Sequence, residues 1–312
     1  MTQPILHHYA ISPYAEKIRR VLAWKQLAWQ SVTIPPVMPK PDVVALTGGY
    51  RKTPILQIGS DIYCDTALIC DVLEHLQPAP SLYPARAKGL ARILAQWADS
   101  ALFWAAMGHN FTPQGVQQLF PLAGGTSQQV FSDDRASMRQ GMARARAQDA
   151  ASAYRSYLRR LADMLDGQHY LLGDRPAVAD FAAYHPLWFT RVCTPAVASI
   201  LDATPSVLRW MDRIAAVPDS RVGDLDAGAA LLVAATQALR EPVADTFQDD
   251  HGLPLGSQVS IASDFFGVEP SVGELVAATR MHYTIRRTDP RAGTLHVHFP
   301  RIGYVLRAAT AT

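Results

Sequence analysis

The spacing of hydrophobic and polar residues changes twice along the chain. In the first 80 residues, strand-like alternation and helical spacing both occur. Short runs that alternate apolar with polar positions predict strands at residues 3–10, 29–34 and 53–65, the last a hairpin around Gly59-Ser60. Apolar residues three or four positions apart predict helices at 13–27 and 66–76. Four prolines within 35–42 predict an irregular crossover. The order of these elements predicts an α/β unit over residues 1–80.

From residue 86 the spacing is that of helices alone. One helix is expected over 89–107, where an apolar stripe consists of Leu90, Ile93, Leu94, Trp97, Ala101 and Trp104. Residues 108–133, rich in Gly, Gln, Pro and Ser, are expected to form a loop. Further helices are predicted at 139–165, 180–192, 205–216 and 226–240. An all-helical domain is therefore expected over 86–240.

The last part of the chain alternates again. Five short runs between residues 256 and 308 are separated by Pro, Gly and Asp turns. This pattern predicts a small all-β, barrel-like domain over 250–312.

Composition narrows the functional classes. The formal net charge is +2 and 18% of residues are charged, which gives no electrostatic basis for binding nucleic acid or an anionic membrane. The most apolar later run, 225–239, is too short to span a bilayer, and the N-terminus lacks the pattern of a secretory signal. Three cysteines without metal-ligand spacing fit a reduced, cytoplasmic protein with no metal.

Ser12 stands at the start of the first predicted helix, directly before Pro13. Proline suits the first helical position because its missing N–H has no partner there in any case. Ser12 is then the helix cap, a structural role worth about 1 kcal/mol. The same position also favours an anion, because a hydroxyl at the positive end of a helix can donate to a thiolate and lower its pKa. Both interpretations stay open.

Two further segments are predicted at the same edge of the sheet. Thr53-Pro54 opens a strand, where a cis peptide bond would turn the backbone of Thr53 outward. Asp65-Thr66 begins a helix and offers a carboxylate, a hydroxyl and free backbone N–H groups to a zwitterion. Together with Ser12, these groups describe a site for a peptide-like thiol.

The same segments resemble a known family. "SPYAEKIR" (12–19) is similar to the "CPFAxRxR" opening of omega- and zeta-type glutathione transferases, with serine in place of cysteine. "RKTPIL" (51–56) resembles their "GxVPxL" segment, and "YCDTALI" (63–69) resembles their acidic-hydroxyl signature. The resemblance covers residues 1–220 and implies a thioredoxin-like domain, an all-α domain and a homodimer. The β domain lies outside this two-domain architecture.

The resemblance also implies how glutathione, the co-substrate, is bound. Thr53, before a cis Pro54, would pair its backbone with the cysteinyl unit. Asp65 and Thr66 would hold the γ-glutamyl end, and Lys40 would contact the glycine carboxylate.

The catalytic role would fall to Ser12, which would donate a hydrogen bond to the glutathione sulfur, with Tyr14 as a rival or helper. A serine hydroxyl cannot be attacked by a disulfide as a cysteine can, so it favours attack of glutathione on a small apolar electrophile. Part of the Trp97 and Trp104 stripe would line the pocket of that second substrate. Two alternatives remain: a non-catalytic glutathione-binding or regulatory protein, and a glutathione-dependent disulfide-bond reductase.

Some residues depart from the family or have weaker functional interpretations. The helix-capping box of the family reads Ala177 and Asp180 here, so its hydroxyl is missing. Arg51-Lys52-Thr53 replaces the "Gly-x-Val" that precedes the proline in the family, which leaves the local loop shape open. His282, His296 and His298 could form a metal trio, but packing is preferred because no acidic ligand is fixed beside them.

Overall fold

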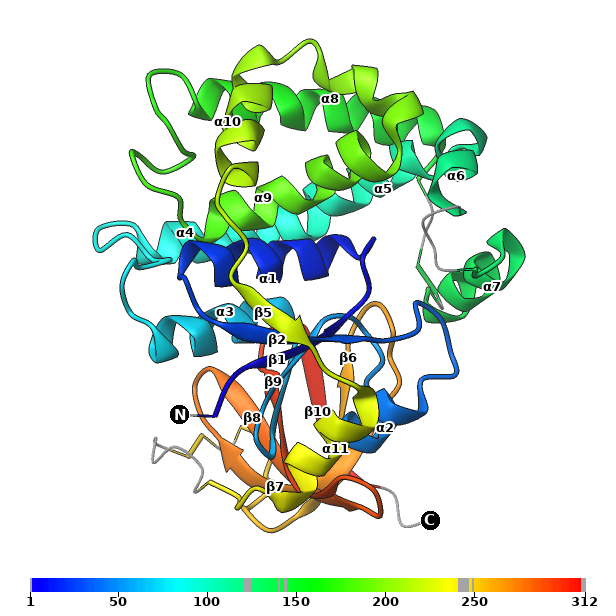
Figure 1. Cartoon of the computed structure of the whole chain (residues 1–312), viewed down its shortest axis with the longest axis vertical. Coiled ribbons are helices and arrows are strands. Elements are labelled where there is room, and N and C mark those ends of the chain that lie inside the picture. The colour runs from blue at the N-terminus through cyan, green and yellow to red at the C-terminus, as the bar shows by residue number, and fades with distance from the viewer. Residues whose placement is uncertain are drawn as a thin grey trace.

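The structure, a computed structural model, describes residues 2–120, 125–139, 141–142, 145–240, 247–248 and 250–309. Among these residues, no helix combines the length and the apolar character that a membrane span requires. Helices form one half of the molecule, and strands accompanied by short helices form the other (Figure 1).

The first unit has the predicted order of elements. They are β1 (Ile5–His8), α1 (Pro13–Trp24), β2 (Trp29–Thr33), α2 (Pro41–Thr47), β3 (Ile55–Ile58), β4 (Asp61–Cys64) and α3 (Thr66–Leu76). Helix α2 differs from the expected crossover, which is irregular only as far as Lys40. Pro41 occupies the first turn of α2, where a proline has no hydrogen bond to lose. The proline that signalled a loop therefore begins a helix.

The second unit is helical. Its elements are α4 (Lys88–Trp97), the π-helical turn η1 (Ala98–Leu102), α5 (Phe103–Asn110), α6 (Pro113–Leu119), α7 (Gln128–Met138), α8 (Ala147–Met164), α9 (Val178–Trp188), the π-helical turn η3 (Phe189–Cys193), the 3₁₀ helix η4 (Pro195–Leu201) and α10 (Pro205–Ala215).

The loop expected at 108–133 is wrong, because it contains α6 and most of α7. Ser127 caps α7 by accepting a hydrogen bond from the Val130 N–H at 3.3 Å, and the helix buries Phe131 and Met138. The helix expected at 139–165 is shorter and begins at Ala147. The part of that expectation on residues 140, 143 and 144 lies outside the described residues.

Two members of the expected apolar stripe turn away from the core, whereas Leu94, Trp97 and Trp104 are half-buried and pack against it as expected. Leu90 is 56% exposed and Ile93 is 67% exposed, whereas Ala91 and Ala95 are buried. Helix α4 packs against α9 through these alanines. Small side chains allow two helices to approach closely, so the alanines form the contact with α9 while Leu90 and Ile93 point outward.

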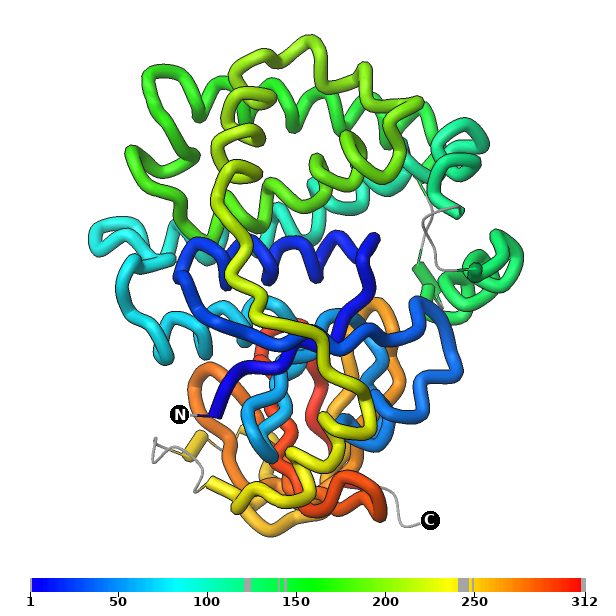
Figure 2. Tube along the Cα trace, in the orientation of Figure 1, coloured from blue at the N-terminus to red at the C-terminus, as the bar shows by residue number. Residues whose placement is uncertain are grey.

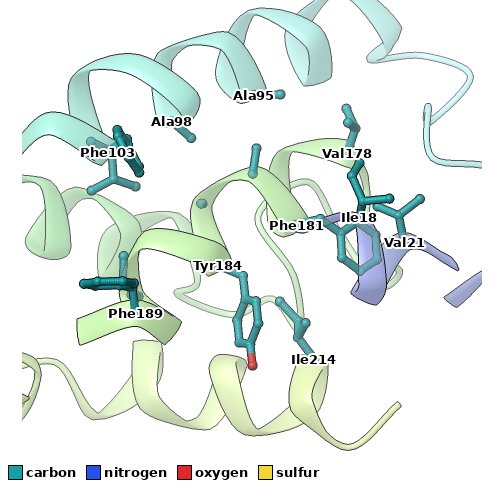
Figure 3. Packing of buried hydrophobic residues seen from close by; sticks show 14 of the residues in the cluster. Ile18, Val21, Ala95, Ala98, Phe103, Val178, Phe181, Tyr184, Phe189 and Ile214 are labelled. Carbon is teal, nitrogen blue, oxygen red and sulfur yellow. The ribbon is translucent and has the colours of Figure 1, made fainter. Parts of the chain in front are cut away.

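Helix α1 joins the two units. Its apolar face contributes Ile18 and Val21 to a core that also contains Val178 and Phe181 of α9 (Figure 3). The N-terminal end of α1 is therefore held in place between the sheet and the helical unit.

After α10 the chain returns to the sheet. Strand β5 (Arg221–Asp224), which the sequence did not predict, pairs in parallel with β2. The chain then forms α11 (Ala227–Thr236), the helix expected at 226–240. Figure 2 shows this segment running from the helical half across the sheet to the opposite half. Helix α11 packs against α2 and β9 rather than against the helical unit.

The five C-terminal strands are present as expected. They are β6 (Gln258–Ser263), β7 (Ser271–Ala278), β8 (His282–Asp289), β9 (Gly293–Pro300) and β10 (Tyr304–Ala308). They do not stand apart from the first unit, because β9 pairs in parallel with β4. One ten-stranded sheet results, in the order β10-β6-β7-β8-β9-β4-β3-β1-β2-β5.

A second core lies under this continuous sheet. It combines Ile5 and Ile62 of the first unit with Leu275 and Val297 of the C-terminal strands and Leu231 of α11. Since apolar burial is the main favourable contribution to folding, the C-terminal strands and the thioredoxin-like unit stabilise one another.

Candidate functional site

Three segments of the predicted site meet at one edge of the sheet. Residue His7 of β1 pairs with Ile55 of β3, and Ile55 pairs with Cys64 of β4. The loop after β1, the Thr53-Pro54 segment before β3 and Asp65 after β4 therefore leave the sheet on the same side. The Thr53–Pro54 bond is cis, as the resemblance implies.

Ser12 is the cap of α1. Its hydroxyl oxygen accepts a hydrogen bond from the Ala15 N–H at 3.3 Å, and its own N–H donates to the Tyr9 carbonyl at 3.1 Å. The cap bond uses the oxygen as an acceptor, so the hydroxyl hydrogen can still be donated to a ligand. Ser12 is 2% exposed, so only a small part of its surface is open to such a ligand.

The Tyr14 side chain has structural partners. Its hydroxyl donates to the Asp99 carbonyl at 2.5 Å, and its ring packs against those of Phe103 and His185 at 4.7 and 4.6 Å between centroids. Burial, followed by the charge of Asp99, raises the pKa of Tyr14, so the phenol stays protonated. This geometry favours packing over a role at the sulfur.

Lys40 and Thr53 lie in direct contact. The Lys40 Nζ donates to the Thr53 hydroxyl at 3.3 Å and to the Arg51 carbonyl at 3.2 Å. Both acceptors are uncharged, and Lys40 is buried. Burial and the nearby Arg135 guanidinium lower the pKa of Lys40 to about 7, although Asp134 opposes them. A ligand carboxylate would supply the counter-charge that this ammonium lacks among its direct partners.

Helix α7 closes this side of the site. Asp134 accepts from the Arg51 guanidinium at 2.8 Å and from the Met38 N–H at 3.0 Å. Arg135 donates to the Tyr9 hydroxyl at 3.2 Å and to the Pro36 carbonyl at 2.9 Å. The sequence predicted a loop over the first part of α7 and no element at Asp134 or Arg135, so sequence analysis missed these contacts.

Asp65 caps α3 from an unusual backbone conformation. Its φ is +78°, which few residues other than glycine adopt. One carboxylate oxygen accepts from the Ala67 N–H at 2.9 Å, and the other accepts from the Tyr304 hydroxyl at 3.1 Å. The Asp65 N–H donates to the Tyr50 hydroxyl at 3.1 Å. Tyr304 belongs to the C-terminal strand β10, so two tyrosines outside the predicted site set the position of Asp65.

Thr66 is linked to α1 by a buried lysine. The Lys17 Nζ donates to the Thr66 hydroxyl oxygen at 3.0 Å and forms an ion pair with Asp99 at 2.5 Å. His185 Nε2 lies 3.0 Å from the same carboxylate. Burial alone would lower the pKa of Lys17, but Asp99 outweighs it and the net shift is upward. The ammonium therefore stays charged and ties Thr66 to α1, five residues after Ser12.

One local pattern indicates half of this pair. Lys17 lies four positions before Val21 and so on the apolar side of the predicted helix, and a lysine buried there must find a counter-charge. Its partner, Asp99, lies 82 residues away, and sequence spacing does not reveal it.

The C-terminal histidines form no metal centre among the described residues. His298 Nε2 lies 3.0 Å from the Asp61 carboxylate and its Nδ1 lies 2.9 Å from the Thr284 hydroxyl. His296 and His298 hold the pKa of Asp61 at about 2, against the opposing effect of burial. An acidic neighbour is thus present where none was expected, and it stabilises the junction between β4 and β9.

Two surface hollows lie elsewhere. One, of about 440 Å³, is lined by His109, Arg155 and Thr204 among others, and another, of about 650 Å³, is lined by residues of β7 and β8. Neither borders Ser12 or Asp65. The candidate site is therefore defined by the convergence of its residues and not by the size of a cavity.

Family models match both halves of the predicted transferase architecture. The model described as "Glutathione S-transferase, N-terminal domain" matches residues 6–81, and the model described as "Glutathione S-transferase, C-terminal domain" matches residues 142–213. The strands β6–β10 lie outside both matches. Comparison with curated proteins finds no match for the sequence.

Solved structures extend the likeness to the whole chain. A GST-like protein from Pseudomonas syringae is 38% identical, with a TM-score of 0.83, and the match covers 99% of this chain and 100% of that one. A glutathione S-transferase from Rhodospirillum rubrum is 20% identical, with a TM-score of 0.51 and coverage of 76% and 94%. A beta-etherase from Sphingobium is 19% identical, with a TM-score of 0.51 and coverage of 70% and 96%. The last two show the fold alone.

The P. syringae protein matches over the C-terminal strands as well as over the two transferase units, so these strands are shared between the two chains. On the strength of this full-length match, and of the two family models, the chain belongs to the glutathione S-transferase superfamily.

Proposed function

We propose that the protein is a glutathione-dependent transferase in which Ser12 stabilises the thiolate of bound glutathione. The observation that carries this proposal is the geometry of Ser12 at the start of α1. Its oxygen caps the helix, which leaves the hydroxyl hydrogen for the sulfur, and the helix end adds positive potential. Both effects favour the ionised thiol, which is the attacking form.

The remaining residues support a defined orientation of glutathione. Lys40 would receive the glycine carboxylate, Thr53 would pair with the cysteinyl unit, and Asp65 with Thr66 would hold the γ-glutamyl end. The charges match, because glutathione has a carboxylate at each end and an ammonium beside one of them. In this orientation the sulfur would lie toward Ser12.

An electrophile would be held by aromatic side chains near α1. The rings of Tyr14 and Phe103 are in contact, and Phe103 lies 5.1 Å from Trp104, which is half-buried. Such a surface suits a small, largely apolar substrate. In the reaction, the thiolate sulfur would attack a carbon atom of that electrophile and form a sulfur–carbon bond. The bond from this carbon to the leaving group would break, and the leaving group would depart with the electron pair.

The decisive experiment titrates bound thiol in the Ser12→Ala variant. Loss of a hydrogen bond to a charged group is worth about 1.5–3 kcal/mol, so the pKa of bound glutathione should rise by about 1–2 units. The measurement is thiolate absorbance against pH at saturating glutathione.

Ser127→Ala is the matched control, because Ser127 caps α7 with the same 3.3 Å geometry and is exposed. The Ser127→Ala variant should lose a similar amount of helix-capping stabilisation and leave the titration of bound glutathione unchanged. An unaltered titration in Ser12→Ala would reduce Ser12 to a cap. Equal turnover of a glutathionylated disulfide by wild type and Ser12→Ala would favour a disulfide-bond reductase instead.

We also propose a homodimer. Leu90 and Ile93 of α4 are more than half exposed and lie one helical turn apart. Apolar residues grouped in this way are typical of a surface that a second protein covers, and a second copy of the chain is the partner that the family resemblance implies.

A further inference from the structure

The C-terminal strands contact the candidate glutathione site from outside both transferase family matches. Ser263 at the end of β6 accepts from Lys52 at 3.0 Å, and Glu269 pairs with Arg51 at 2.7 Å. Both contacts are made by the two residues that directly precede Thr53. The Tyr304 hydroxyl reaches Asp65 itself.

Tyr304 controls the second oxygen of the Asp65 carboxylate. The cap bond from the Ala67 N–H fixes only the first oxygen, Oδ1. A carboxylate held at one oxygen can still rotate, whereas the Tyr304 hydroxyl at 3.1 Å from Oδ2 fixes its plane. Each carboxylate oxygen accepts more than one hydrogen bond. Oδ2 can therefore bind Tyr304 and still accept from the ammonium of a ligand.

Tyr304 is itself held rigidly. It is buried, its ring packs against Phe299 at 5.7 Å and Tyr50 at 6.4 Å, and the Lys52 ammonium lies 4.8 Å from its centroid. Burial, followed by the charge of Asp65, raises the pKa of Tyr304. The hydroxyl therefore remains a donor toward Asp65 at every pH at which the protein would work.

We propose that Tyr304 is a positioning residue for ligand binding, and that the C-terminal strands are part of the glutathione site. Tyr304 orients Asp65 toward the α-ammonium of a γ-glutamyl compound. This inference rests on the proposed function, because it requires that the protein binds glutathione. It also gives the C-terminal strands a role that the two-domain architecture does not provide.

The test compares Tyr304→Phe with the wild-type chain. The substitution keeps the ring and its packing and removes one hydroxyl. The dissociation constant of S-methylglutathione should rise about five- to tenfold, as expected for a hydrogen bond that orients a charged group. With glutathione saturating, kcat should stay unchanged, since Tyr304 acts through Asp65 on the γ-glutamyl end and not on the sulfur. The effect should therefore appear in KM for glutathione.

Tyr283→Phe is the matched control. Tyr283 is a buried tyrosine of β8 in the same group of strands, and it lies against the Arg301 guanidinium, 4.7 Å from its ring centroid. This variant should bind S-methylglutathione as the wild type does. Similar thermal unfolding of both variants would show that neither substitution perturbs the fold.

A second ligand separates orientation of Asp65 from a general structural effect. The glutathione analogue that has a glutaryl group, and so no α-ammonium, should bind wild type and Tyr304→Phe with equal, weak affinity. An equal loss of affinity for both ligands in Tyr304→Phe would overturn the inference, and so would an unchanged affinity for S-methylglutathione. Failure of the wild type to bind S-methylglutathione would instead overturn the proposed function, so the two failures are distinguishable.

Discussion

Binding of S-methylglutathione is expected to weaken as the pH rises, because Lys40 loses its proton. The ligand is chosen because its blocked sulfur cannot titrate. In the free protein the pKa of Lys40 lies at about 7, and a carboxylate beside the ammonium would raise it on binding. The contribution of Lys40 is then complete below pH 7 and declines as the pH rises through the pKa of the free protein.

The size of the change in the dissociation constant follows from the fraction of Lys40 side chains that is protonated. At about pH 6 most Lys40 side chains are charged, and at about pH 8 only about one in ten is charged. Binding at about pH 8 must therefore include proton uptake. The dissociation constant should be about tenfold higher at about pH 8 than at about pH 6, which corresponds to about 1.4 kcal/mol.

Isothermal titration calorimetry measures both consequences. The dissociation constant gives the pH dependence, and the heats in buffers of different ionisation enthalpy give the number of protons taken up. Lys40→Met should bind weakly at every pH, with no slope and no proton uptake. A wild-type affinity that is level across this range would refute the assignment of Lys40 to the glycine carboxylate.

Three other variants test the stability and assembly of the fold. Asp180→Ala should lower the free energy of unfolding in urea by about 3–5 kcal/mol. The buried Asp180 carboxylate accepts from the Ala177 and Leu171 N–H groups and from Trp210 Nε1, each at 2.9 Å, and the variant leaves these donors without a partner. A loss below about 1 kcal/mol would contradict this. Asp61→Asn should lower the free energy of unfolding by about 2 kcal/mol at neutral pH and by little near pH 2. The ionised Asp61 stabilises the fold above about pH 4, and this contribution disappears as the pH falls through its pKa of about 2. Ile93→Asp should convert a dimer to a monomer in light scattering with little change in urea unfolding, since Ile93 is 67% exposed; an unaltered dimer would place the interface elsewhere.

Local signals in the sequence predicted the parts of the site that depend on helix ends. Ser12 before Pro13, and Asp65 before an apolar helical run, both indicate caps, and both residues are caps in the structure. The shared sheet edge followed from the order of strands and helices alone. The carboxylate of Asp180 likewise accepts from the Ala177 N–H, although alanine lacks the hydroxyl that would complete the capping box.

The features that the sequence did not predict depend on contacts between distant segments. Tyr304 lies 239 residues from Asp65, and its role at the site appears only once β9 has paired with β4. The exposed Leu90 and Ile93 show a different difficulty. Their helical spacing indicates one apolar face but not which neighbour covers it, and the small alanines of α4 determined the packing against α9.

The pairing of β4 with β9 has a consequence for the order in which the protein can fold during synthesis. Asp61 and His298 are 237 residues apart in the chain, so the ribosome must make all of the intervening residues before β4 can pair with β9. Until then the nascent chain carries an open strand edge and a half-covered apolar layer, and both promote association with other chains. A chaperone bound to the nascent chain would prevent this association until β9 and β10 emerge.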